Sequence, residues 1–100
     1  MPVHHKFDPS AKTLAITISG DFNFDVNASF RETYRNINPN EVSNVSVNLK
    51  NTTYMDSSAL GMLLLLDEHF EDVQTTLEQC PDYIQSVLKI ANFDQKFGIS

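Results

Sequence analysis

Residues 48–70 read NLKNTTYMDSSALGMLLLLDEHF, and this stretch carries more structural information than any other part of the chain. Apolar and polar residues alternate in segment 45–49, which predicts a strand with one buried face. The polar run at 51–53 predicts a loop after that strand. The Asp- and Ser-rich motif that follows, and the apolar run behind it, predict a helix that ends at about Glu71.

The start of this helix offers three residues that could cap it: Asp56, Ser57 and Ser58. Asp and Ser side chains accept hydrogen bonds from the backbone N–H groups that a first helical turn leaves unpaired. One interpretation is therefore purely structural, with one of these residues serving only as the N-cap.

Upstream of this stretch, two strands and a helix are predicted. Turn residues at 8–12 separate the two strands, and the second strand alternates over 14–19 and ends at 20–21. Asp25 is expected to cap the helix, and segment 36–40 with its proline is expected to end it. The helix is indicated by an apolar stripe at spacings of four, four and three: Val26, Phe30, Tyr34 and Ile37.

Downstream, a short strand is predicted at 73–79, a third helix begins at Pro81 with an apolar stripe over 84–91, and a last edge strand falls at 97–99. Strands that alternate with helices pair in parallel and carry the helices against the sheet. The first two strands, joined by a tight turn, should pair antiparallel. We therefore expect one α/β domain over residues 1–100, with a mixed, mostly parallel sheet of four to five strands and helices packed against it.

Composition narrows the class of protein. Hydrophobic residues make up 41% and charged residues 20%, as in ordinary globular domains. The net charge of -6 argues against binding nucleic acid or an anionic membrane surface. The longest apolar run, 62–66, is far shorter than the roughly 20 residues of a membrane helix. The N-terminus lacks the pattern of a secretory signal, and a lone Cys80 cannot form an intrachain disulfide, so a cytoplasmic location is expected.

The segment YMDSSALG at 54–61 resembles the motif that opens the central helix in the anti-sigma factor antagonist group of STAS domains. Those proteins typically carry an aromatic-Met or similar pair followed by Asp-Ser-Ser-Gly-Leu-Gly, and here Ala59 stands where Gly is usual. The turn GDFN at 20–23 resembles the Gly-Asp/Glu-Leu-Asp turn of the family, with Asn23 in place of the usual Asp. The resemblance covers nearly the whole chain and implies the STAS fold.

What the resemblance implies is a partner switch. In that group, the Ser directly after the Asp is phosphorylated by a partner serine kinase, which is often also the anti-sigma factor, and a partner phosphatase reverses the reaction. By this correspondence Ser57 is the phosphoacceptor, and Thr52, Thr53 and Ser58 are weaker candidates by position. The unmodified protein is expected to bind the kinase or anti-sigma factor, and the phosphorylated protein to release it.

Residues around Ser57 are expected to contact the partner, namely Asp21, Asn23, Asp56, Ser58, Ala59, Gly61 and Leu65. On a helical wheel, an arc of roughly 200° is expected to pack on the sheet, formed by Leu60, Met62, Leu63, Leu64, Leu66 and Phe70. Leu65 falls outside this arc, beside Gly61 and Glu68. Two interpretations of Leu65 stay open: a single exposed leucine without a role, or part of a docking surface with the Ser57 turn.

Other functions have less support in the sequence. The fold could serve as an accessory subunit of a transporter or as a scaffold in a signalling complex, with Ser57 only a helix N-cap. His4, His5 and His69 lack the matching companions of a metal site, and no Lys or Arg flanks Cys80 to activate it. We therefore predict no catalytic residue, metal or cofactor, and expect a cytoplasmic bacterial regulator of transcription that is not itself an enzyme.

Overall fold

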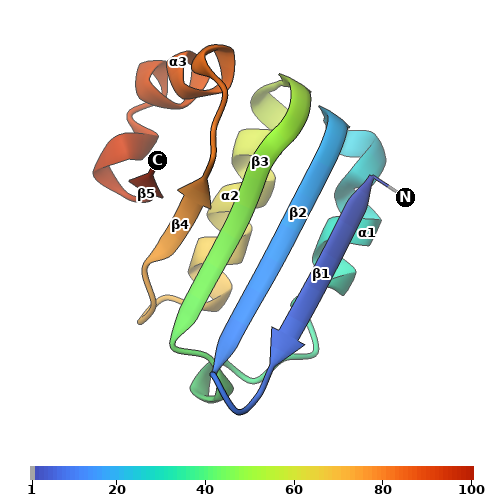
Figure 1. Ribbon diagram of the computed structural model, residues 1–100, viewed down its shortest axis with the longest axis vertical. Helices are drawn as coiled ribbons and strands as arrows, with labels where there is room; N and C mark the ends of the chain where they lie inside the picture. The colour runs from blue at the N-terminus through green and yellow to red at the C-terminus, as the bar shows by residue number, and fades with distance from the viewer. Residues whose placement is uncertain (1) are drawn as a thin grey trace.

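The computed structural model describes residues 2–100 and shows one five-stranded sheet in the order β1-β2-β3-β4-β5 (Figure 1). The strands are β1 (Val3–Asp8), β2 (Thr13–Phe22), β3 (Asn44–Met55), β4 (Thr75–Glu78) and β5 (Gly98–Ile99). The helices are α1 (Asn27–Glu32), α2 (Ser57–His69) and α3 (Asp82–Ile90), with 3-10 turns η1 (Phe24–Val26), η2 (Pro39–Glu41) and η3 (Phe93–Gln95). The predicted α/β class and element order are confirmed.

The strand pairing also follows the prediction. β1 and β2 pair antiparallel, with Val3 opposite Ile18. The pairs β2–β3, β3–β4 and β4–β5 are all parallel. Because parallel strands need a crossover between them, α1, α2 and α3 each connect one parallel pair. α1 and α2 lie against the sheet, whereas α3 lies past the end of β4 (Figure 1).

The two faces of the sheet differ. Figure 1 shows α1 and α2 behind the sheet, whereas no helix of the described chain crosses the front of β1, β2 and β3. The side chains of the helix-covered face are fully buried and form the centre of the core, for example Leu14, Ile16, Ile18, Val47, Leu49 and Leu77. The residues between them, such as Thr17, Ser46 and Asn48, are only partly buried. This alternation is the one that the sequence predicts.

Two strands continue beyond their predicted ends. Gly20 does not break β2: the strand runs to Phe22, and its pairing with β3 shifts register on either side of Gly20. Gly20 has φ +81°, a left-handed conformation that glycine adopts without strain. The predicted loop at 51–53 is likewise part of β3, because the extended β2 pairs with it. Thr52 is buried there, and its hydroxyl donates to the Ile18 carbonyl at 3.0 Å.

The first helix is shorter than predicted and begins differently. Asn23, and not Asp25, is the capping residue: its Oδ1 accepts from the Asp25 backbone N–H at 3.0 Å and begins η1. α1 then ends at Glu32, because the backbone N–H of Thr33 bonds to the Phe30 carbonyl three residues back instead of continuing the α-helical pattern. The stripe still faces inward, since Phe30 and its neighbours in the stripe are buried or partly buried.

The last part of the chain is close to the prediction. α2 ends at His69, and β4 occupies only the middle of the predicted segment 73–79. Gln79 has φ +53°, which ends the extended conformation of β4. α3 follows Pro81 as expected and is held by the buried side chains Ile84 and Leu88.

Candidate phosphoacceptor site and docking face

The start of α2 is fixed by one carboxylate oxygen. Oδ1 of Asp56 accepts hydrogen bonds from the backbone N–H groups of Ser58 at 3.0 Å and Ala59 at 3.2 Å. It also accepts from the Ser58 hydroxyl at 2.6 Å. Asp56 is therefore the N-cap. Of the three candidate caps in the sequence, Ser57 does not have this role, so the interpretation of Ser57 as only an N-cap is wrong.

The same contacts set the charge state of Asp56. The hydrogen bond from the Ser58 hydroxyl, followed by those from backbone N–H groups, holds the pKa of this carboxyl below its ordinary value of 3.8. Partial burial acts in the opposite direction but does not outweigh them. Asp56 thus carries a negative charge beside Ser57 at neutral pH.

Ser57 is the first residue of α2, and its side chain is exposed. The hydrogen bonds at this helix start involve Asp56 and Ser58, and none within residues 2–100 engages the Ser57 hydroxyl. An exposed, uncommitted hydroxyl is open to an incoming enzyme. Thr53 is exposed as well, whereas Thr52 is buried and bonded to a carbonyl, which removes it from the candidates for modification.

The exposed residues of α2 form a face that begins at Ser57, hereafter the α2 face: Ser57, Gly61, Leu64, Leu65 and Glu68. Leu65 is 51% exposed, as its place on the helical wheel predicts. Leu64 was expected to pack on the sheet but is 39% exposed, because the sheet-facing arc of α2 is narrower than the predicted one. Ala59 is fully buried in the core, which places its side chain away from the α2 face.

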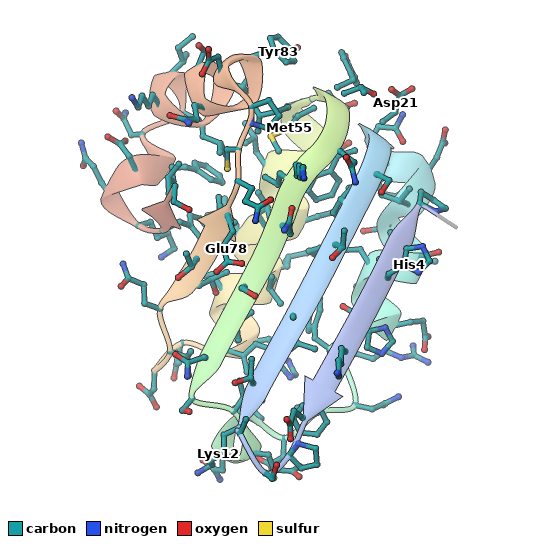
Figure 2. All side chains as sticks on the ribbon, in the orientation of Figure 1. His4, Lys12, Asp21, Met55, Glu78 and Tyr83 are labelled. Carbon is teal, nitrogen blue, oxygen red and sulfur yellow. The ribbon has the colours of Figure 1, made fainter. Side chains whose placement is uncertain are left out.

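The end of β2 lies beside the start of α2. Asp21 pairs with Tyr54 and Phe22 pairs with Met55, so the β2 end is one residue from the Asp56 cap along the neighbouring strand. Figure 2 shows Asp21 and Met55 at the same end of the sheet. The structure therefore brings exposed Asp21 toward Ser57, while the side-chain oxygen of Asn23 is occupied by capping η1.

Three aromatic side chains are exposed near this end of the sheet and were not expected there: Phe24, Tyr54 and Tyr83. Phe24 follows the end of β2, Tyr54 pairs with Asp21, and Figure 2 shows Tyr83 at the same end of the molecule as Met55. Aromatic residues are normally assigned to the core from sequence, because burial is their usual state. Only their position at strand and helix ends could have indicated otherwise.

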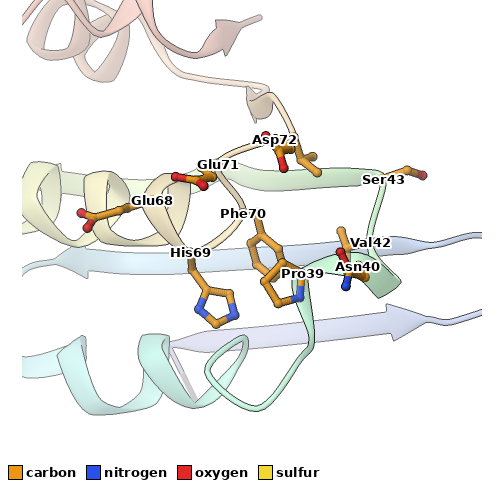
Figure 3. A pocket seen from close by; sticks show the side chains of 10 residues that line it. Pro39, Asn40, Val42, Ser43, Glu68, His69, Phe70, Glu71 and Asp72 are labelled. Carbon is orange, nitrogen blue, oxygen red and sulfur yellow. The ribbon is translucent and has the colours of Figure 1, made fainter.

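The other end of α2 holds a cavity of about 570 Å³ next to η2. Figure 3 shows Glu68, His69, Glu71 and Asp72 among the side chains that line it. His69 Nε2 is hydrogen-bonded to the Ile37 carbonyl at 2.9 Å, so that nitrogen carries its proton and is not free to bind a metal. No group of three or more His, Cys, Asp or Glu residues within 2–100 is placed to hold a metal ion.

Cys80 is buried after β4, and burial raises the pKa of its thiol, which makes it less reactive. No helix in the described part of the chain combines the length and apolarity that crossing a bilayer requires.

Comparison with known proteins covers almost the whole chain. The STAS domain family matches residues 5–100. A STAS-domain containing protein of Pseudomonas aeruginosa (strain UCBPP-PA14) is 44% identical over 96 residues, covering 92% of this chain and 94% of that protein.

Solved structures agree at the level of the fold. The anti-sigma factor antagonist SpoIIAA in its unphosphorylated form gives a TM-score of 0.75 at 18% identity, covering 98% of this chain and 86% of that one. The phosphorylated form of SpoIIAA, a Bacillus cell fate determinant, gives a TM-score of 0.67 at 15% identity, covering 98% of this chain and 90% of that one. A sulfate transporter family protein from Wolinella succinogenes gives a TM-score of 0.74 at 18% identity, covering 87% of this chain and 72% of that one. The match over residues 5–100 and the Pseudomonas relative confirm the resemblance seen in the sequence: this chain belongs to the STAS domain family.

Proposed function

We propose that this protein is a partner-switching regulator of the anti-sigma factor antagonist type, controlled by phosphorylation of Ser57. The observation that carries the proposal is the exposed hydroxyl of Ser57, which makes no hydrogen bond within residues 2–100 because Asp56 does the capping. The fold is shared with SpoIIAA in both its phosphorylated and its unphosphorylated form, which supports a switch of this kind.

A phosphate on Ser57 is compatible with the fold. It would add about 1.5 to 2 negative charges at the first residue of α2. The helix dipole and the N–H groups of a first turn favour an anion there. Because Ser57 is exposed, the phosphate would remain in water and displace no packed side chain. The free protein therefore stays folded after modification.

The effect of the phosphate falls on the interface with the partner. Binding would take the phosphate out of water next to the ionised Asp56, with Asp21 also at this end of the sheet. Desolvation and like-charge repulsion both oppose that step. Moving a partner from 99:1 bound to 1:99 takes about 5.5 kcal/mol of differential binding, and burial of an unpaired multiple charge is an effect of several kcal/mol.

The α2 face supports docking through a second feature, the glycine at its centre. A Cβ atom at Gly61 would meet nothing within 4 Å, so the packing of the protein itself does not require a glycine. Glycine inside a helix costs about 1 kcal/mol relative to alanine. A bare backbone next to Leu65 would instead allow a partner to approach the helix closely.

In this proposal the partners are a serine kinase that is also, or acts with, an anti-sigma factor, and a serine phosphatase. The domain itself contributes no catalytic group: Ser57 is a substrate, and the target of regulation is transcription. The protein works in the bacterial cytoplasm, where such kinases and ATP are found.

Phosphorylation with the cognate serine kinase and ATP tests the acceptor assignment. Mass spectrometry of the digested product should place one phosphate on Ser57, and the Ser57→Ala variant should remain unmodified. Ser58→Ala is the matched control, since it removes the neighbouring hydroxyl and leaves the acceptor in place. A phosphate on Ser58 or Thr53 in the wild-type protein, or none at all, would contradict the proposal.

The alternative is an accessory or scaffold role, which one observation favours: a sulfate transporter family protein shares the fold. The two functions differ in how they respond to Ser57 variants. A switch requires Ser57→Ala to retain the kinase partner in an affinity pull-down and Ser57→Asp to lose it. Equal retention by both variants would favour the scaffold role.

A further inference from the structure

A second exposed site lies about eight residues further along α2. A groove of about 430 Å³ opens between the end of α1 and the second half of α2. Its lining residues come from both elements and the turn after α1: Arg31, Tyr34, Arg35, Leu65, Glu68 and His69. At a helical rise of 1.5 Å per residue, Leu65 is about 12 Å from Ser57 along the axis. The groove is therefore distinct from the phosphoacceptor.

The groove concentrates positive charge on an acidic protein. Only two arginines occur in a chain of net charge -6, and Arg31 and Arg35 both line this groove. Arg35 is paired with Glu32 at 2.7 Å, but both side chains are about half exposed, and such pairs are weak and exchange readily. Arg31 has no ion pair within residues 2–100. Its guanidinium is available to a carboxylate.

Tyr34 provides a hydrogen-bond donor beside Arg31. The residue is only 5% exposed, and its ring packs edge-on against Phe30 and His69, with ring centroids 5.9 Å and 5.2 Å away. Its hydroxyl makes no hydrogen bond in the described part of the chain and is not among the fully buried polar atoms, so it is open to a ligand in the groove that Tyr34 lines. Burial raises the pKa of Tyr34, partly offset by nearby Arg31, so the hydroxyl stays protonated at neutral pH.

We propose that this groove binds an acidic segment of a protein partner, with a carboxylate on Arg31 and the Tyr34 hydroxyl and an apolar side chain on Leu65. Arg31 and Tyr34 supply donors in one place, which suits a carboxylate acceptor. Leu65, half exposed beside them, suits an adjacent apolar residue. Glu68 on the same lining repels a second carboxylate and so fixes which way the segment lies.

The overall charge argues for a short acidic peptide rather than a polyanion. Nucleic acid would meet the repulsion of the whole protein, whereas one or two carboxylates sense mainly the two arginines. The groove shares Leu65 and Glu68 with the α2 face, but the inference does not rest on the proposed function, because it uses neither the phosphate nor the hydroxyl of Ser57 and is tested through Arg31. Its failure would leave the Ser57 switch untouched.

The test is an NMR titration of the ¹⁵N-labelled, unphosphorylated protein with a synthetic helical peptide that presents glutamates at i and i+4 around a leucine. Saturable shifts should appear at residues 31–35 and 65–69 and weaken as salt is raised. The same peptide with Gln for Glu should bind more weakly, by up to about fivefold for each exposed ion pair that is lost. Equal binding of both peptides, or no shifts in this groove, would overturn the proposal.

Variants of the charged residues show whether each charge strengthens or weakens binding of the peptide. Arg31→Gln should weaken the acidic peptide by about fivefold and Glu68→Gln should strengthen it by about twofold, as expected for exposed charges. Lys89→Gln, a matched loss of an exposed cation on α3, should change nothing. An effect of Lys89→Gln as large as that of Arg31→Gln would reduce the groove to non-specific attraction. Displacement of the peptide by inorganic phosphate at equal concentration would make it a small-anion site and also overturn the proposal.

Discussion

At the scale of single residues, Asp56 combines two roles, one as a helix cap and one as a charge beside Ser57. Its Oδ1 satisfies the first turn of α2, and its charge lies beside the hydroxyl proposed to receive a phosphate. A neutral amide could accept the hydrogen bonds of the first turn but could not supply the charge. Substitution of Asp56 by Asn therefore separates hydrogen bonding from charge.

Asp56→Asn should lower the Tm by a few degrees at pH 7, because the charged cap interacts better with the N–H groups and the helix dipole. The folded pKa of Asp56 is depressed below 3.8, so its stabilising effect is complete above that pH and is lost as pH falls through the lowered value. Thermal unfolding followed by circular dichroism should show the two proteins converging below about pH 4. A gap that stays constant from pH 7 to pH 3 would show that charge contributes nothing.

Thr75, at the start of β4, is a residue whose substitution should increase the stability of the protein. Its side chain is fully buried, and its hydroxyl is the one buried side-chain polar atom of the described residues without a hydrogen-bond partner. Thr75→Val keeps the shape and removes the unpaired hydroxyl, so the free energy of unfolding should rise by about 1 kcal/mol. Urea unfolding measures this change. Thr76→Val, on the partly exposed neighbour, is the control and should change stability little; a loss of stability in Thr75→Val would reveal a missed partner.

At the scale of elements, α2 shows how one helix serves both the core and the surface. Leu65 is half exposed, whereas the next residue, Leu66, is completely buried. Leu65→Glu should shift the Tm by no more than about 2 °C, since exposed substitutions usually stay within about 0.5 kcal/mol. Leu66→Glu should unfold the protein, because an unpaired charge would enter the core.

Under the proposed function, Leu65→Glu is expected to lose partner binding while the protein stays folded. Calorimetry and a pull-down on the same preparation measure both properties. Equal loss of folding in Leu65→Glu and Leu66→Glu would assign Leu65 to the core and remove it from the α2 face.

The interiors of the elements were predictable, and their ends were not. Alternation at 14–19 and 45–49 identified the two central strands, because a half-buried strand imposes a period of two. Thr52 was assigned to a loop because it is polar, but pairing with β2 and a hydrogen bond to Ile18 place it in a strand. Contacts between elements distant in sequence decide such ends, and local pattern does not contain them.

The candidate sites show the same division. The motif that holds the proposed phosphoacceptor is a contiguous run of sequence at 54–61, so it could be recognised from the sequence. The groove joins Arg31 and Arg35 to Leu65 across two packed helices, and only the fold brings these residues together. The exposure of Leu64 likewise depends on how α2 is rotated against the sheet.

At the scale of the whole molecule, the proposed switch depends on separation between the modified end and the core. Ser57 sits at one tip of α2, outside the buried cluster that joins the sheet to α1 and α2. Charge added at an exposed tip perturbs the core little. The same charge dominates a surface that a partner must cover.

Phosphorylation of Ser57 should therefore leave the protein folded and change only its partner. The far-UV circular dichroism spectrum of the phosphoprotein should match that of the unmodified protein, and its Tm should lie within about 4 °C, since an anion at a helix N-terminus changes stability by about 0.3 to 1 kcal/mol. Affinity for the kinase partner, measured by isothermal titration calorimetry in the absence of ATP, should fall by at least a hundredfold, about 2.7 kcal/mol. Since core packing is untouched, NMR shift changes should be confined to the start of α2 and the neighbouring end of β2. Shifts spread across β4 and α3 would mean that the phosphate acts by rearranging the fold, and a repulsive contact at the interface would then no longer explain the switch.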